Sequence, residues 1–201
     1  MEFRDVVRRR RMVRTFDPNR PVPTEMVERL LDHAVRAPSA GFSQGWGFLV
    51  LEQPADRERF WRVATPDDGD VWSRWLVGMR TAQLIIVAHS NKDVYLDRYA
   101  QQDKGWTDRD ESRWPVPYWD IDTGFASLLM LLTAVDEGLG ACFFGIPPSQ
   151  TAGYRAEFAV PEAFTPIGAI GFGYRAPDQR SPSLRRGRRP ADDVIRRGQW
   201  S

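Results

Sequence analysis

Ala37-Pro38-Ser39-Ala40-Gly41-Phe42-Ser43-Gln44-Gly45-Trp46 separates a segment with apolar residues at helical spacing from an apolar run at residues 48–51. Its small residues allow a flat ligand to approach the backbone closely. Gln44 can donate and accept hydrogen bonds at once, which suits an amide edge such as that of a pyrimidine ring. By itself the stretch is equally compatible with a tight helix-to-strand turn that places Trp46 in the core.

Outward from this loop, helices and strands follow one another without regular strand–helix–strand alternation. A continuous β-branched run makes residues 84–88 the clearest strand. Helices are predicted at residues 3–10, 24–35, 54–64, 71–81, 122–137 and 149–158, and further strands at 48–51, 141–146 and 166–174. This order predicts one α+β domain over residues 1–201.

Composition and charge exclude several classes of protein. The 201 residues carry a net charge of +1, so no strong attraction to nucleic acid is expected, although an arginine- and aromatic-based nucleic-acid binder remains an alternative. No run approaches the roughly 20 apolar residues that span a bilayer, and the charged N-terminus is unlike a secretory signal. With one cysteine, no internal disulfide can form, and we expect a cytoplasmic protein.

Arginine is concentrated at the two ends of the chain. Only two of the 28 basic residues are lysines. The arginines gather at Arg8, Arg9, Arg10, Arg11 and Arg14, and again at Arg185, Arg186, Arg188, Arg189, Arg196 and Arg197. The planar guanidinium group suits phosphate, so two remote clusters that met in the fold would hold one anion. The plainer alternatives are a solvated charged face and a frayed basic tail.

Residues 91–120 form a polar segment rich in aromatic side chains. Such a segment in a compact domain is typical of a lid or binding insert, since exposed aromatic rings are costly. The alternative is a surface loop that is held in place by its own aromatic side chains. Candidate substrate or lid residues are Phe42, Trp106, Trp114 and Trp119.

Other chemistries find little support in the sequence. The sequence contains no glycine-rich phosphate-binding loop at the start of a helix. It also lacks the sharp strand-to-helix turn around a nucleophilic serine that serine hydrolases use. His33 and His89 are isolated from ligand-spaced carboxylates, so no metal site is expected. Cys142 lies in an apolar run, which favours a core position over a nucleophile.

Four segments, taken in order, together resemble the nitroreductase-like family of FMN-dependent oxidoreductases. The family's Arg-Arg-Ser-x-Arg-x-Phe segment is similar to residues 10–16, and its Ala-Pro-Ser-x-x-x-x-Gln-x-Trp loop to residues 37–46. Its apolar helix ends like Gly138-Leu139-Gly140, ahead of Phe144-Gly145, and its basic tail is similar to Arg186-Gly187-Arg188-Arg189-Pro190. The resemblance spans nearly the whole chain.

The resemblance implies a central, mainly antiparallel sheet flanked by helices, built as an intertwined homodimer with FMN sites at the interface. The residues that it implies for FMN fall into three groups. They are Arg10, Arg11, Met12 (backbone only), Arg14, Arg186 and Arg188 at the phosphate; Pro38, Ser39 and Ala40 from the other subunit, with Gly41 and Gln44 close to that segment; and the backbone of Phe144 and Gly145 near flavin N5.

The implied reaction passes hydride from NADH or NADPH to flavin N5, and then to an electrophile such as a nitroaromatic or quinone in the same cleft. The cofactor carries this chemistry, so no catalytic side chain is assigned. Met12 stands where serine is usual, Phe42 where asparagine is common and Gly45 where proline is common. Two alternatives are a flavin-binding storage or regulatory protein without turnover, and an FMN-fragmenting dimethylbenzimidazole synthase, which has aspartate in place of Met12.

Overall fold

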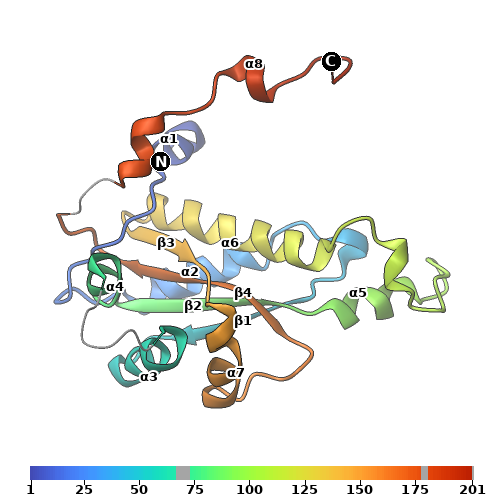
Figure 1. Cartoon of the computed structure of the whole chain (residues 1–201), viewed down its shortest axis with the longest axis horizontal. Helices are drawn as coiled ribbons and strands as arrows, with labels where there is room; N and C mark the ends of the chain where they lie inside the picture. Colours follow the sequence, from blue (N-terminus) through green and yellow to red (C-terminus); the bar gives the residue numbers. More distant parts are fainter. Residues whose placement is uncertain (67–72, 178–180, 201) are drawn as a thin grey trace.

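A four-stranded antiparallel sheet forms the centre of the computed structural model, which describes residues 1–66, 73–177 and 181–200. Its strands are β1 (Trp46–Leu51), β2 (Leu84–Ser90), β3 (Gly140–Phe144) and β4 (Thr165–Gly173), in the spatial order β1-β2-β4-β3 (Figure 1). The predicted α+β class and the antiparallel sheet are confirmed. The predicted strand at 141–146 ends earlier, so Gly145 lies just beyond it.

Helices flank this sheet, and the first and last of them project away from it. They are α1 (Phe3–Arg9), α2 (Thr24–Ala34), α3 (Pro54–Ala64), α4 (Arg74–Met79), α5 (Lys92–Tyr99), α6 (Tyr118–Asp136), α7 (Pro148–Glu157) and α8 (Ala191–Val194), with short 3-10 turns η1 (Ala40–Phe42), η2 (Glu111–Arg113) and η3 (Pro182–Arg186). The start of the helix predicted at 71–81 lies outside the described residues. Helix α6 begins four residues before the prediction, because Tyr118 and Trp119 belong to it.

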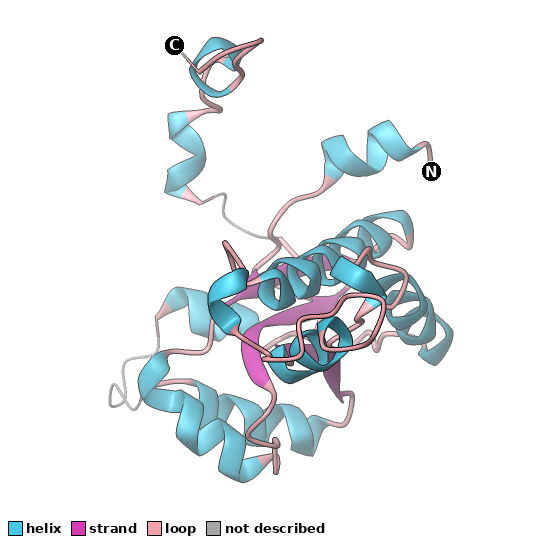
Figure 2. Cartoon of the chain, turned by 90° about the vertical axis from the view of Figure 1, so that its right-hand side faces the viewer, coloured by secondary structure: helices cyan, strands magenta, loops and turns pink. Residues whose placement is uncertain are grey.

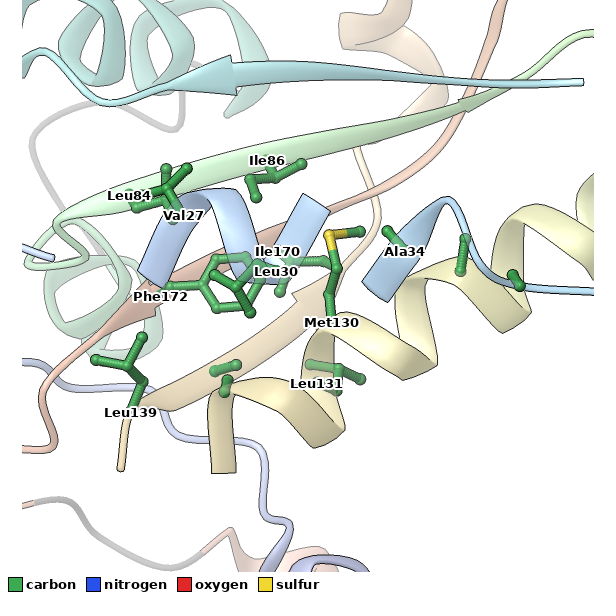
Figure 3. Close-up of a cluster of buried hydrophobic side chains, with 14 residues drawn as sticks. Val27, Leu30, Ala34, Leu84, Ile86, Met130, Leu131, Leu139, Ile170 and Phe172 are labelled. Carbon is green, nitrogen blue, oxygen red and sulfur yellow. The ribbon is translucent and has the colours of Figure 1, made fainter. Parts of the chain in front are cut away.

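Strand β2 separates two apolar clusters. All seven of its residues are buried, and alternate side chains point to opposite faces. Leu84 and Ile86 pack with α2 and α6 on one face, in the cluster drawn in Figure 3. Ile85 and Val87 pack on the other face against α3, α4 and α7. Helices on both sides explain why this antiparallel strand reads as a continuous apolar run.

Both ends of the chain stand away from the sheet. Helix α1 and the segment that ends in α8 project from the same side of the body, as Figures 1 and 2 show. The side chains of residues 183–200 are exposed, and those of Leu184, Ile195 and Trp200 are apolar. Across residues 1–66, 73–177 and 181–200, no helix combines the length and apolarity that crossing a bilayer requires.

The chain between α1 and α2 lies against the outer edge of β3. Met12 forms a parallel bridge with Ala141, and the Val13 N–H donates to the Ala141 carbonyl at 2.9 Å. Further on, the Phe16 N–H donates to Thr81 Oγ1 at 2.8 Å. Helix α4 reaches this segment only because residue 78 is glycine, since a Cβ there would overlap the Arg14 carbonyl oxygen.

Gly78→Ala should therefore destabilise the protein by about 1–3 kcal/mol, the usual cost of an overpacked contact. Gly153→Ala in α7 is the matched control, because its added Cβ meets open space. The control should be neutral or gain up to about 1 kcal/mol from helix propensity. Denaturant unfolding at one protein concentration measures both, and equal stabilities for the two variants would contradict the close approach of α4.

Candidate functional site

A pocket of about 620 Å³ brings the two ends of the chain together. Arginines dominate its wall, and no carboxylate belongs to it among the described residues. Its lining comprises Arg8, Arg10, Arg11, Met12, Val13, Arg14, Arg175, Ala176, Ser181, Ser183, Leu184 and Arg188. The pocket thus joins most of the candidate phosphate residues predicted from the sequence. Arg186 is the exception: it lies on η3 and is exposed.

One arginine of this pocket, Arg10, is incompletely hydrogen-bonded. Its Nη1 atom is buried and has no hydrogen-bond partner. Buried polar groups in proteins are nearly always paired, so such a donor calls for an acceptor. By contrast, the guanidinium group of Arg14 has a partner within the chain, since its Nη1 donates to the Met12 carbonyl at 3.3 Å. A phosphate beside Arg10 would form short, charge-assisted hydrogen bonds.

Backbone pairing puts the N-terminal arginines beside the segment that leads to the C-terminus. The Asp17 N–H donates to the Tyr174 carbonyl at 2.9 Å, and the Ala176 N–H to the Thr15 carbonyl at 3.2 Å. Because Met12 also bridges to β3, residues 12–17 lie between β3 and the chain after β4. The convergence of the two arginine clusters therefore follows from the sheet.

The loop before β1 is held by a buried carboxylate. Asp122 on α6 is 3% exposed, and its Oδ2 accepts from the Ala40 N–H and the Tyr95 hydroxyl, both at 2.8 Å. Burial, and then the hydrogen bond to Asp122, raise the pKa of Tyr95. The sequence reasoning missed Asp122. Its one signal is its place near the start of a helix that is otherwise mostly apolar.

Helix α5 holds the same loop from another side. Arg98 Nε donates to the Gly41 carbonyl at 3.0 Å, and the Asn91 N–H donates to the Gly45 carbonyl at 2.7 Å. The ring of Tyr99 leaves no room for a Cβ at Gly41. These contacts keep the loop in an uncommon backbone conformation.

Phe42 projects from the loop as an aromatic tip. The side chain of Phe42 is 75% exposed. Its backbone φ is 55°, in the left-handed region that is unfavourable for residues other than glycine. Gln44 has the same φ, and its N–H donates to Ser39 Oγ at 3.0 Å. Strain of this kind persists where surrounding contacts compensate for it, and it is common at binding sites.

The segment at 91–120 is packed, and it contains helix α5. Trp114 is the centre of an aromatic cluster, with its ring centroid 4.5 Å from that of Tyr99, 5.6 Å from Trp106 and 6.0 Å from Trp119. Trp119 belongs to α6 and is buried. The cluster adjoins the Gly41 loop through Tyr99, so the candidate lid residues and Phe42 lie in one region.

Phe144 and Gly145 lie at the other edge of the sheet. The Phe144 ring stacks on Trp61 at 5.5 Å and contacts Trp75 edge-on at 5.4 Å. Gly145 is exposed, and a Cβ there would meet nothing within 4 Å. Two strands separate β3 from β1, so these residues lie about 14 Å, or three strand spacings, from the strand that follows the Ala40 loop.

The histidines belong to the packing. His89 is buried, with Nε2 2.9 Å from the Tyr154 hydroxyl, and this burial lowers its pKa. His33 Nδ1 lies 2.7 Å from Thr133 Oγ1. Within the described ranges, no group of three or more histidine, cysteine or acidic side chains is arranged to hold a metal.

The model of the nitroreductase family matches residues 7–67 and 68–174. The chain belongs to the nitroreductase family. A relative from Methanothermobacter thermautotrophicus, named "Putative NADH dehydrogenase/NAD(P)H nitroreductase", is 26% identical over 178 residues, which cover 88% of this chain and 78% of that protein.

Solved structures of other nitroreductases share the fold along its full length. The nitroreductase CinD of Lactococcus lactis, in complex with nicotinic acid, has a TM-score of 0.78 at 18% identity, covering 98% of this chain and 100% of its own. A "putative nitroreductase" of Desulfovibrio desulfuricans, in complex with FMN, has a TM-score of 0.71 at 22% identity, covering 100% and 99%. The nitroreductase-like fold expected from the four sequence segments is confirmed.

The Asp122 contact gives a direct test of how this nitroreductase holds its loop. Asp122→Ala leaves two buried donors unpaired and should cost about 2–4 kcal/mol. Asp122→Asn keeps one carbonyl oxygen that can accept both bonds, so its loss of stability should be smaller. Denaturant unfolding of the two variants measures the difference, and an alanine variant as stable as the asparagine variant would rule out this role for the carboxylate.

Proposed function

We propose that this nitroreductase is an FMN-dependent oxidoreductase that acts as a homodimer, oxidises NADH or NADPH and reduces an electrophile such as a nitroaromatic or quinone. The observation that carries the proposal is the pocket lined by arginines from both ends of the chain, one of which, Arg10, has a buried Nη1 without a hydrogen-bond partner. When bound, FMN supplies hydride transfer between donor and acceptor, so the chain need only bind and orient the reactants.

The phosphate of FMN fits the arginine pocket. Arg10, Arg11, Arg14 and Arg188 line it, and Arg186 lies exposed two residues before Arg188. Met12 offers backbone atoms only, because its thioether cannot replace a hydroxyl donor. A phosphate there would pair the orphaned donor of Arg10 and offset the mutual repulsion of the guanidinium groups.

The isoalloxazine ring would lie against residues from two subunits. The open backbone at Gly145, next to Phe144, is near the arginine pocket because both adjoin β3. Pro38, Ser39, Ala40, Gly41 and Gln44 precede β1 at the opposite sheet edge. A second copy of the chain would bring its own Ala40 loop to the β3 edge, which makes the site composite.

An exposed apolar stripe on α6 supports this dimer. Tyr118, Ile121, Phe125 and Leu128 recur at helical spacing, and each is 36–45% exposed. Such a stripe on a surface helix marks an association surface. The projecting C-terminal segment would then close over the partner, with its apolar side chains covered. Phe42, Trp106, Trp114 and Trp119 would border the substrate cleft from the loop and the 91–120 insert.

The visible spectrum of the purified protein, before and after anaerobic addition of NADH and then NADPH, tests the function. We expect a flavin spectrum that bleaches with at least one donor and recovers on addition of a quinone or nitroaromatic. Absence of flavin after incubation with FMN would refute the proposal. Bound flavin that neither donor reduces would instead identify a flavin-binding protein without turnover.

Phe125→Glu tests the dimer. A charge in the α6 stripe should weaken association at least about 100-fold, since an unpaired buried charge costs several kcal/mol. FMN retention should fall in parallel if the site is composite. Light scattering over a dilution series measures the oligomer, and absorbance measures the flavin.

Ala156→Glu on the exposed side of α7 is the matched control, and it should change neither property. A Phe125→Glu variant that remains dimeric would place the interface elsewhere. A wild-type monomer that retains FMN would contradict the composite site.

A further inference from the structure

A second arginine pocket, of about 480 Å³, adjoins the first. Met1, Arg8, Arg9, Arg11, Val135, Gly138 and Arg175 line it. It shares Arg8, Arg11 and Arg175 with the larger pocket, whereas Arg9 lines only the smaller one and Arg188 only the larger. Its lining residues come from α1, the end of α6 and the chain after β4, and Ser183 and Leu184 of the larger pocket are not among them.

The charge in this second pocket is not neutralised by the protein. In the described part of the chain, the side chains of Arg8, Arg9, Arg11 and Arg175 form no hydrogen bond or ion pair, and no carboxylate lines the pocket. Asp136 forms an ion pair with the N-terminal amino group of Met1, at 2.6 Å. Several arginines elsewhere are paired with carboxylates, as Arg29 is with Glu137 at 2.7 Å.

The arginines also act on one another. Partial burial, and then the charges of Arg11 and Arg9, lower the pKa of Arg175. Like charges held this close raise the free energy of the folded state unless an anion joins them. The cluster therefore favours an anionic ligand.

One FMN cannot account for all of this charge. Seven different arginines line the two pockets, six of them in the larger pocket and Arg9 in addition in the smaller. A phosphate monoester carries only about two negative charges near neutral pH. Both pockets have the fork-shaped donors that match phosphate oxygens, yet FMN brings a single phosphate.

We propose that the pocket formed by Arg8, Arg9, Arg11 and Arg175 is a second anion site, which binds the phosphate group of a small phosphorylated molecule other than the FMN. This inference rests on the proposed function only in assigning the larger pocket to FMN. The ligand is either the dinucleotide electron donor or a free phosphorylated compound, and both present the same phosphate oxygens.

A crossover of two arginine variants tests the proposal. Full-length protein, incubated with FMN, is titrated calorimetrically with sodium pyrophosphate at low ionic strength. Arg9→Ala should weaken pyrophosphate binding about tenfold, the effect of losing one charge-assisted hydrogen bond, and leave flavin occupancy unchanged. Arg188→Ala should lower flavin occupancy and leave the pyrophosphate affinity within about twofold. Arg9 is exposed, so its variant should fold normally, which thermal unfolding checks.

Equal pyrophosphate binding by wild type and Arg9→Ala would overturn the second site. So would an Arg188→Ala variant that loses pyrophosphate as strongly as Arg9→Ala, because the two pockets would then be one site. Protein that never binds FMN but shows Arg9-dependent pyrophosphate binding would refute the proposed function and support this inference.

Competition identifies the source of the phosphate. Displacement of pyrophosphate by NADPH but not by NADH would assign the site to the additional phosphate of NADPH. Displacement by both would assign it to the pyrophosphate that the two donors share. Displacement by neither would assign the site to a free phosphorylated compound. Each result supports the anion site and differs only on its occupant.

Discussion

The antiparallel pairing of β2 with β4 is the constraint on which the rest of the molecule depends. These two strands occupy the middle of the sheet, so β1 and β3 become its edges. The Ala40 loop precedes one edge strand, and the arginine pocket adjoins the other. The core therefore fixes the positions of both regions, and within a single chain it keeps them at opposite edges of the sheet. Apolar burial on both faces of β2 supplies the free energy that holds this arrangement.

Local patterns in the sequence are sufficient to predict most helices and strands and the family. They do not reveal contacts between residues that are distant along the chain. The β-branched run at 84–88 and the apolar spacing in α6 predicted their elements well. The composition of residues 91–120 predicts a polar insert, because α5 has only a weak apolar periodicity. The helix packs through the contact of Tyr99 with Trp114, which local periodicity cannot reveal. Asp122 was missed because its partners, Ala40 and Tyr95, are 82 and 27 residues away.

The loop before β1 shows how an unfavourable backbone conformation can be maintained by contacts with neighbouring helices. Phe42 and Gln44 both adopt left-handed backbone conformations, which a free peptide would leave. Asp122, Arg98 and the backbone of Asn91 hold the loop from α6 and α5 together. The aromatic insert contacts the loop through the ring of Tyr99, which lies against Gly41. We therefore expect the effects of substitutions in the insert and in the loop on the free energy of unfolding to be non-additive.

The two sheet edges differ in their protection. Met12 occupies the outer side of β3, whereas the outer side of β1 has no strand partner within the described residues. The sequence of β1 is Trp46-Gly47-Phe48-Leu49-Val50-Leu51. It lacks the charged residues and prolines that usually prevent an exposed edge strand from pairing with another chain. Unpaired N–H and C=O groups along such a strand act as a template for intermolecular β-pairing. Aggregation of the newly made or partly unfolded chain would accordingly begin at β1, and a single lysine on its outer edge is the natural remedy.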